Sequence, residues 1–192
     1  VLDVATGLAG FSMIYNWPDN FPKLVLSDND PFIINSLSYY LKLVGKKNVI
    51  FVEADYPTFP SKIAAFGFIM ANKFLHHLKR PDRIKFLKWS MDILEPNGVL
   101  EILDTDLEYH ILEQSKQPEF GDRLTLGYRE TLVKIEKNFI STLKSDIEDA
   151  GFRVTHFDCR DYFDETDAFS QNPGDNLSLK FSGLEIVAEK PA

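Results

Sequence analysis

The residues at the start of the chain that could do chemistry are Asp3, Gly7 and Gly10, in the stretch VLDVATGLAGFS. Asp3 interrupts an apolar run of strand length, where a carboxylate is costly unless it is paired. The glycines let backbone N–H groups of the following turn approach a ligand closely. The carboxylate would repel a pyrophosphate and would suit a ligand with an amino group and a sulfonium. The alternative is a tight turn without a ligand, capped by Asp3.

A second candidate set is the pair His76 and His77, in the stretch FLHHLKRPDRIKFL. Histidine titrates near neutral pH, so either ring could act as a general base. A packing or helix-capping role for His76 is the alternative. We predict no metal site.

The first hundred residues have a pattern of alternating strands and helices, and these elements must position the candidate residues named above. Five short apolar runs with little polar alternation, typical of strands covered on both faces, are Val1–Ala5, Leu24–Ser27, Asn48–Glu53, Phe66–Ala71 and Val99–Leu103. Residues at helical spacing lie between them. Pro31 and Pro81 suit first helical turns, and Gly45 and the turn Glu95–Gly98 follow the two helix ends. The pattern predicts a parallel sheet with right-handed crossovers.

The second half predicts one long helix and two further strands. Helical spacing extends over Tyr128–Ala150, and a strand follows at Arg153–Phe157. The stretch Asp161–Asn176 is rich in Asp, Asn, Gly and Pro and is typical of a loop. Leu177–Glu189 has a strand pattern with a break near Ser182. With 192 residues and no linker, residues 1–192 are expected to form a single domain.

Composition and charge narrow the classes of partner. The net charge of −8 argues against a partner held by phosphate contacts, and only the cluster Lys79–Lys85 suggests a local basic patch. A single cysteine, Cys159, excludes an internal disulfide and favours a reducing compartment. No apolar run reaches the length of a spanning helix and no signal peptide is visible, so we expect no membrane partner and a cytoplasmic location. The oligomeric state stays open.

Taken together, the segments resemble class I S-adenosylmethionine-dependent methyltransferases. VLDVATGLAG is similar to that family's first motif, with Ala5 and Ala9 in place of two glycines. Six later segments resemble the remaining strands in the family's order: LVLSDND, NVIFVEADY, FGFIMANKFLHHL, ILEPNGVLEILD, IEDAGFRVTHFD and GLEIVAEKP. The resemblance covers nearly the whole chain. It implies an α/β fold with a doubly wound, mostly parallel seven-stranded sheet, helices on both faces and an antiparallel last strand.

The resemblance also implies a cofactor, S-adenosylmethionine, with S-adenosylhomocysteine as product. Asp28 would accept hydrogen bonds from the ribose hydroxyls and Asp55 from the adenine amino group, with Tyr56 beside the adenine ring. For both acids a simple turn role is the alternative. The complete set of implied cofactor-binding residues is Asp3, Ala5, Gly7, Gly10, Asp28, Asn29, Asp55, Tyr56 and Asn72.

The acceptor is expected to be a small molecule. The segment with His76 is similar to the His-Asp-Trp region of one small-molecule O-methyltransferase subfamily, although His77 and Leu78 replace the Asp and Trp. Nucleic-acid amino methyltransferases carry an Asn/Asp-Pro-Pro-aromatic motif where this chain has ANKF, so no nucleic-acid partner is expected. Family members have helices before the first strand that shape the acceptor site. We expect this chain to lack them.

Two other functions fit parts of the pattern. A nicotinamide-dependent oxidoreductase would also use a glycine-containing loop with an acid, here Asp28, about 20 residues further on. A cofactor-binding or regulatory domain without catalysis would explain Ala5, Ala9 and the altered His-Asp-Trp region. The leading hypothesis is an enzyme that moves a methyl group to an oxygen, nitrogen or carbon atom of a small molecule.

Overall fold

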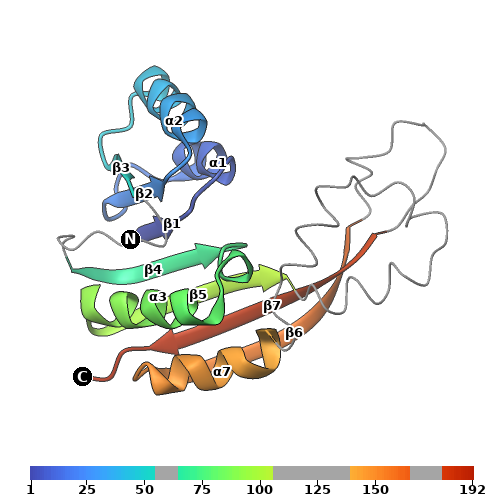
Figure 1. Ribbon diagram of the computed structural model, residues 1–192. Helices are drawn as coiled ribbons and strands as arrows, with labels where there is room; N and C mark the ends of the chain where they lie inside the picture. The colour runs from blue at the N-terminus through green and yellow to red at the C-terminus, as the bar shows by residue number, and fades with distance from the viewer. Residues whose placement is uncertain (55–64, 106–138, 165–178) are drawn as a thin grey trace.

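The computed structural model describes residues 1–54, 65–105, 139–164 and 179–192 (Figure 1). Their strands form a seven-stranded sheet in the order β3-β2-β1-β4-β5-β7-β6. The strands are β1 (Leu2–Val4), β2 (Leu24–Asp28), β3 (Val49–Glu53), β4 (Phe66–Asn72), β5 (Leu94–Thr105), β6 (Arg153–Asp164) and β7 (Leu179–Glu189). All neighbours pair in parallel except β7, which is antiparallel to both β5 and β6. The predicted sheet, with its antiparallel last strand, is confirmed.

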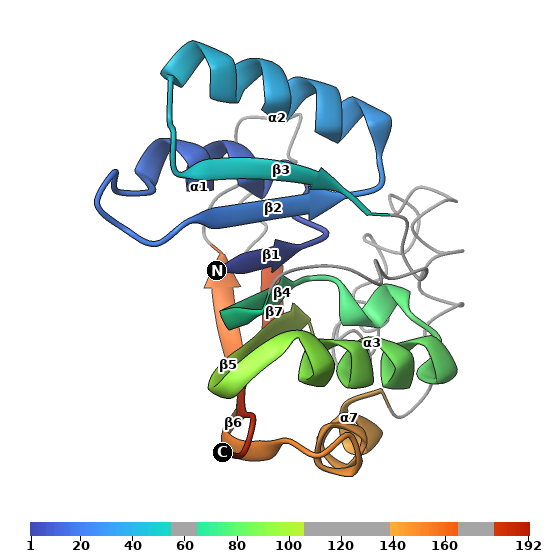
Figure 2. The ribbon, with the colours of Figure 1, turned by 90° about the vertical axis from the view of Figure 1, so that its left-hand side faces the viewer.

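Helices cover both faces of this sheet, as predicted. They are α1 (Ala9–Asn16), α2 (Pro31–Val44), the 3₁₀ turn η1 (Leu75–His77), α3 (Arg80–Ile93) and α7 (Phe139–Asp149). Successive side chains of a strand point to opposite faces. In β2, Leu24 and Leu26 therefore pack with α1 and α2, whereas Val25 belongs to the larger core under α3 and α7. Figure 2 shows the two helix pairs against different parts of the sheet.

The ends of α2 follow the predicted signals. The carboxylate of Asp30 accepts a hydrogen bond from the backbone N–H of Phe32, and Pro31 occupies the first turn. At the other end Gly45 has φ +70°, the left-handed conformation that glycine adopts without steric cost. These caps determine the residue at which α2 begins after β2 and the residue at which it ends before β3.

Three predicted boundaries in the second half of the sheet were wrong. β5 begins at Leu94, directly after α3, and the predicted turn Glu95–Gly98 is an irregularity inside the strand, with Asn97 at φ +61°. β6 continues to Asp164 instead of ending at Phe157. β7 pairs with β6 without interruption, so the break expected near Ser182 is absent there. The lengths of these strands depend on their pairing with neighbouring strands, and this pairing cannot be recognised from local composition.

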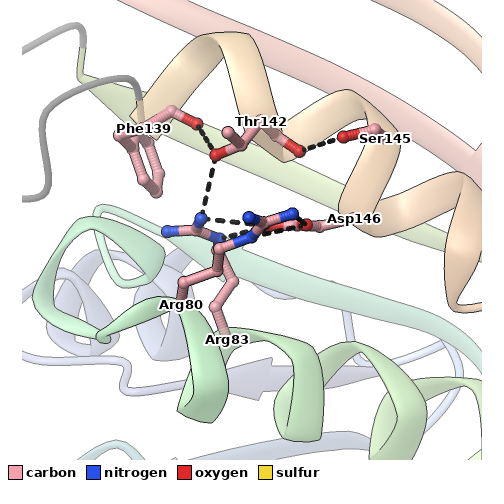
Figure 3. Close-up of polar contacts among 6 residues, drawn as sticks. All are labelled: Arg80, Arg83, Phe139, Thr142, Ser145 and Asp146. Carbon is pink, nitrogen blue, oxygen red and sulfur yellow. Dashed lines mark hydrogen bonds and ion pairs between the residues drawn. The ribbon is translucent and has the colours of Figure 1, made fainter.

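Of the helix predicted over Tyr128–Ala150, the structure describes the part from Phe139. This part, α7, is tied to α3 by a buried ion cluster (Figure 3). The carboxylate of Asp146 accepts hydrogen bonds from the guanidinium groups of Arg80, at 2.8 Å, and Arg83, at 3.0 Å. Arg83 also reaches the hydroxyl of Thr142 at 3.1 Å and lies over the ring of Phe139. The cluster holds the first turn of α3 in place.

Candidate active site

The order of the strands reverses between β1 and β4, which are neighbours although β2 and β3 separate them in sequence. In open α/β sheets the ligand site lies at such a reversal, beyond the carboxyl ends of the strands. In Figure 2 the arrowheads of β1, β2 and β3 point to the side on which the chain leaves β4 toward α3. Predicted site residues from β1, β2 and β4 therefore meet at one edge.

Asp3 lies in the middle of β1 and is 2% exposed. Its carboxylate accepts a hydrogen bond from the hydroxyl of Thr6. No Lys or Arg side chain of the described residues forms an ion pair with it. Burial, with a smaller contribution from the nearby charge of Asp28, raises the pKa of Asp3 to about 6, although the Thr6 hydrogen bond acts in the opposite direction. Asp3 is a buried acid that a positive ligand group would stabilise in its charged form.

The loop after β1 turns on two left-handed residues. Ala5 and Gly7 both have φ +53°, a conformation that costs alanine more than glycine. A Cβ added at Gly7 would meet only the carbonyl oxygen of Ala5, at 4.0 Å, so the space above this part of the loop is open. A ligand can therefore approach the backbone there.

Gly10, which is predicted to contact the cofactor, is packed closely against protein atoms. It lies inside α1, where an added Cβ would come within 2.7 Å of Leu37 Cδ1 and 3.2 Å of the Thr6 hydroxyl. A Cβ there would force the Leu37 side chain to shift, because α1 packs closely on α2. The lack of a side chain at Gly10 therefore allows this packing, and its contact with a cofactor stays a prediction.

Asp28 ends β2 and is 7% exposed. One carboxylate oxygen accepts from the backbone N–H of Gly7 at 2.8 Å, and the other accepts from those of Asn29 and Asp30 at 2.8 and 3.0 Å. Asp28 thus joins the first loop to the second strand and also orders its own turn. The predicted turn role and a ligand role are compatible, because a carboxylate has about four acceptor positions. Asn29 is exposed beside it.

The chain leaves β4 through a sharp turn at the same edge. Asn72 is the last residue of β4 and is exposed. Lys73 follows with φ +50°, and its backbone N–H donates to the carbonyl oxygen of Leu103 at 2.7 Å. This turn directs the chain into η1, which contains both candidate histidines.

His76 is paired with a residue that the sequence reading missed. Asp104, near the end of β5, has a fully buried side chain, and its Oδ1 lies 2.5 Å from Nδ1 of His76. Its other oxygen accepts from the backbone N–H of His76 at 3.2 Å. The only signal in the sequence was an acid closing the apolar run VLEILD. The structure makes a His–Asp pair at the carboxyl ends of β4 and β5.

His77 is exposed, and its ring lies against that of His76 with centroids 3.9 Å apart. Desolvation, followed by the neighbouring His76, lowers the pKa of His77, although the charge of Asp104 acts against this. His77 therefore favours the neutral form and does not share the carboxylate contact of His76.

Asp55 and Tyr56, the two residues predicted at the adenine, lie outside the described residues. Within the part of the chain that is described, no three His, Cys, Asp or Glu side chains are grouped to hold a metal ion. The same part has no helix that is long and apolar enough to cross a membrane. A pocket lined by Asp19, Lys23, Gly45, Lys47 and Asn48 lies at the amino ends of β2 and β3, the opposite edge from the site.

Comparison with known proteins supports the fold. No family model and no curated protein sequence matches the chain. Among solved structures, the chain is similar to a methyltransferase described as S-adenosylmethionine-dependent from Methanosarcina mazei, with 15% identity, TM-score 0.66, and 99% of this chain and 91% of that chain covered. A methyltransferase from Pyrococcus furiosus matches with 12% identity, TM-score 0.60, and 100% and 74% covered.

The cyclase SpnF also matches, with 17% identity, TM-score 0.66, and 100% of this chain and 75% of that chain covered. The chain has the Rossmann-like fold of class I methyltransferases, as the sequence resemblance implied. Identities this low establish no acceptor, and a cyclase among the matches means that the fold does not establish the activity.

Proposed function

We propose that this chain, which has the class I methyltransferase fold, transfers a methyl group from S-adenosylmethionine to a small-molecule acceptor. The observation that carries the proposal is Asp3, a carboxylate that is 2% exposed and has no Lys or Arg ion pair among the described residues. A buried charge without a cation is costly. An amino group or sulfonium near this edge would offset that cost.

The residues present fit this cofactor. Asp3 would act on its positive groups, and the open space over Gly7 would let it approach the backbone of the loop. Asp28 retains acceptor capacity for the ribose hydroxyls. Asn29 and Asn72 are exposed at the same edge and complete the described part of the proposed cofactor site. When bound, S-adenosylmethionine supplies an electrophilic methyl carbon on a positively charged sulfur.

The protein's own contribution to the reaction is alignment and proton removal. We place His76 and His77 beside the acceptor because η1 directly follows β4 at the same edge of the sheet. A small-molecule acceptor is favoured over a nucleic acid by the net charge of −8. The basic cluster in Lys79–Lys85 does not form a free patch, since Arg80 and Arg83 both bind Asp146.

Isothermal titration calorimetry with S-adenosylmethionine and S-adenosylhomocysteine tests the proposal. We expect micromolar binding by the wild type, lost in Asp3→Ala and in Gly7→Leu, which places a branched side chain at φ +53°. Asp92→Ala, on the exposed side of α3, is the matched control and should bind like the wild type.

A folded wild-type protein that gives no binding heat with either compound would refute the proposal. NAD and NADP serve as comparison ligands in the same titrations. Binding of either nicotinamide cofactor, in the absence of binding to S-adenosylmethionine, would favour an oxidoreductase instead.

A further inference from the structure

Several large apolar side chains are exposed on the elements at one end of the sheet. In the described part of the chain they are Leu8, Tyr15, Phe21, Phe32, Tyr39, Leu43, Val44 and Ile50. Four of them belong to α2, although another face of this helix is buried against β2 and β3. In Figure 2, α2 lies at the outer end of the molecule, above β3, the edge strand of the sheet. Single exposed apolar residues are ordinary, but a row of them on one helix indicates a contact surface.

Three of the α2 side chains lie along one face of the helix. Phe32, Tyr39 and Leu43 are 67%, 66% and 65% exposed. Ser36 lies between them on the same face, so the spacing is four, three and four residues, as in the contact seam of paired helices. The buried residues of α2 each follow a residue of this face by one position and so point about 100° away from it. We refer to Phe32, Ser36, Tyr39 and Leu43 as the α2 stripe.

The α2 stripe is complementary to a second copy of itself. When two α2 helices lie antiparallel about a two-fold axis at the middle of the stripe, Phe32 of each copy faces Leu43 of the other. In the same arrangement Ser36 of each copy faces Tyr39 of the other, so the smallest stripe residue leaves room for the longest one. Both contacts occur twice, because a two-fold axis makes every contact reciprocal. All four stripe residues are therefore matched by their own copies.

The charges at the two ends of α2 also suit an antiparallel pair. Asp30 directly precedes the helix, and Lys46 and Lys47 follow its end. Lys46 is bonded to Asp19, whereas Lys47 is exposed and forms no ion pair with another described residue. An antiparallel pair brings Lys47 of one copy near Asp30 of the other, and it also places the two helix dipoles in a favourable antiparallel orientation. A parallel pair would bring like charges together at each end.

We propose that this chain forms a symmetric dimer in which two copies of α2 pack antiparallel along the α2 stripe. The inference does not depend on the proposed function, because it uses no residue of the proposed cofactor site. A helix of 14 residues is about 21 Å long, so the contact is shorter than that of a permanent dimer. We therefore expect a reversible dimer with a Kd of about 10–100 μM.

Analytical ultracentrifugation of the whole chain measures this Kd. We expect the wild type to shift from monomer to dimer between about 1 and 500 μM. Tyr39→Lys should weaken the dimer about 100-fold, because the two-fold axis places the change at two positions of one interface. Tyr15→Lys, on α1 and 69% exposed, is the matched control and should keep the wild-type Kd. A wild type that stays monomeric at the highest concentration, or an equal loss in both variants, would overturn the proposal.

Ser36→Leu distinguishes a specific helix pair from general apolar attraction. The change adds apolar surface to the stripe, but it fills the space that the Tyr39 ring of the other copy needs. We expect the dimer to weaken about tenfold or more, whereas general attraction would strengthen it. Ser38→Leu makes the same change on another face of α2 and should leave the Kd within about twofold. A tighter dimer in Ser36→Leu would overturn the stripe pairing. Circular dichroism checks that each variant is folded.

Lys47→Glu tests the antiparallel direction. It places a negative charge near Asp30 of the other copy, so we expect the dimer to weaken about fivefold at low salt and less at high salt. Lys88→Glu, exposed on α3, changes the net charge by the same amount and is the matched control. In a parallel pair the change would instead relieve repulsion between lysines. A tighter dimer in Lys47→Glu would therefore overturn the antiparallel arrangement.

A lipid surface is the alternative partner for an exposed apolar stripe. Co-sedimentation with phosphatidylglycerol vesicles tests it, and we expect no binding, because the net charge of −8 opposes association with an anionic surface. A chain that is monomeric in solution, sediments with the vesicles and loses this binding in Tyr39→Lys would overturn the dimer and assign the α2 stripe to a membrane.

Discussion

Asp3 and Asp146 are both carboxylates that are 2% exposed, but their surroundings differ. Asp146 lies between α7 and α3 and accepts hydrogen bonds from two guanidinium groups. Asp3 lies in β1 and accepts a hydrogen bond from the hydroxyl of Thr6, and the negative charge of Asp28 acts against its ionisation. The first carboxylate is satisfied within the fold. The second is satisfied only in part, and this is why we propose it as a ligand-binding group.

The comparison distinguishes a carboxylate that is paired with cations inside the fold from one that has no such pair among the described residues. The desolvation cost of a buried ion pair is offset at least in part by its own attraction and hydrogen bonds, and removing one partner leaves the other charge buried and uncompensated, so the fold depends on Asp146 as long as both arginines remain. Asp3 forms no ion pair with a Lys or Arg among the described residues, so its ionised form destabilises the folded state. The four predictions below test this difference, from the largest expected effect to the smallest.

Asp146→Asn should have the largest effect. It leaves Arg83, which is fully buried, and the first turn of α3 without their carboxylate. Removing one partner of a buried ion pair costs about 3–5 kcal/mol of unfolding free energy. Urea denaturation followed by circular dichroism measures this, with Asp149→Asn, exposed on the same helix, as control. A loss no larger than that of the control would mean that the cluster does not stabilise the fold.

Asp3→Asn should act in the opposite direction at pH 8. The pKa of Asp3 is raised from 3.8 to about 6 in the folded protein, so the folded state binds this proton more tightly than the unfolded state. Stability therefore falls as pH rises from about 4 to about 6, and the ionised group costs about 3 kcal/mol above that range. Removing the charge should raise the unfolding free energy at pH 8 by up to this amount.

The same denaturation curves at pH 4 provide the internal control for Asp3→Asn. Asp3 is largely protonated in the folded protein at that pH, so the variant and the wild type should differ little. A variant that is destabilised equally at pH 4 and pH 8 would show that Asp3 has a structural role like that of Asp146.

Thr6→Val should have an intermediate effect. It removes the hydroxyl that donates to Asp3, and a hydrogen bond to a charged group contributes about 1.5–3 kcal/mol. We expect the unfolding free energy to fall at pH 8 and to change less at pH 4, where Asp3 is protonated. Thr6→Ser keeps the hydroxyl and is the matched control. A loss independent of pH would assign the effect to packing.

The smallest expected effect is on cofactor affinity as a function of pH. If the charged form of Asp3 is the one that binds, about one molecule in ten is competent one pH unit below its pKa, and the apparent Kd is about tenfold weaker. Affinity for S-adenosylmethionine measured by calorimetry should therefore increase from pH 5 to pH 7.5. Asp3→Asn should bind weakly at both pH values, and a steep pH dependence in this variant would exclude Asp3 as its source.

The sheet was largely predictable because its strands are short, apolar and separated by helices with clear end signals. Asp30, Pro31 and Gly45 delimit α2 as expected, and the first loop was located by Asp3 and Gly7. The extent of β6 and β7 was not predictable, since it depends on pairing between segments that are distant in sequence.

The predicted site was less complete for a related reason. Asp104 is 28 residues from His76, and only the pairing of β4 with β5 brings the two together. The close packing of Gly10 against Leu37 also could not be predicted, because it depends on the contact of α1 with α2. In both cases the contact joins segments that are distant in sequence, and spacing along the chain does not contain that information.

The hydrogen bond from the Gly7 backbone to Asp28 has a consequence for how fast a ligand binds. It ties the first loop to β2 before a ligand arrives, so the loop does not have to be ordered during binding. The entropy of ordering is lost during folding, and binding should proceed in a single kinetic phase without a slow rearrangement of this loop. For this half of the site, association would be governed by the rate of encounter.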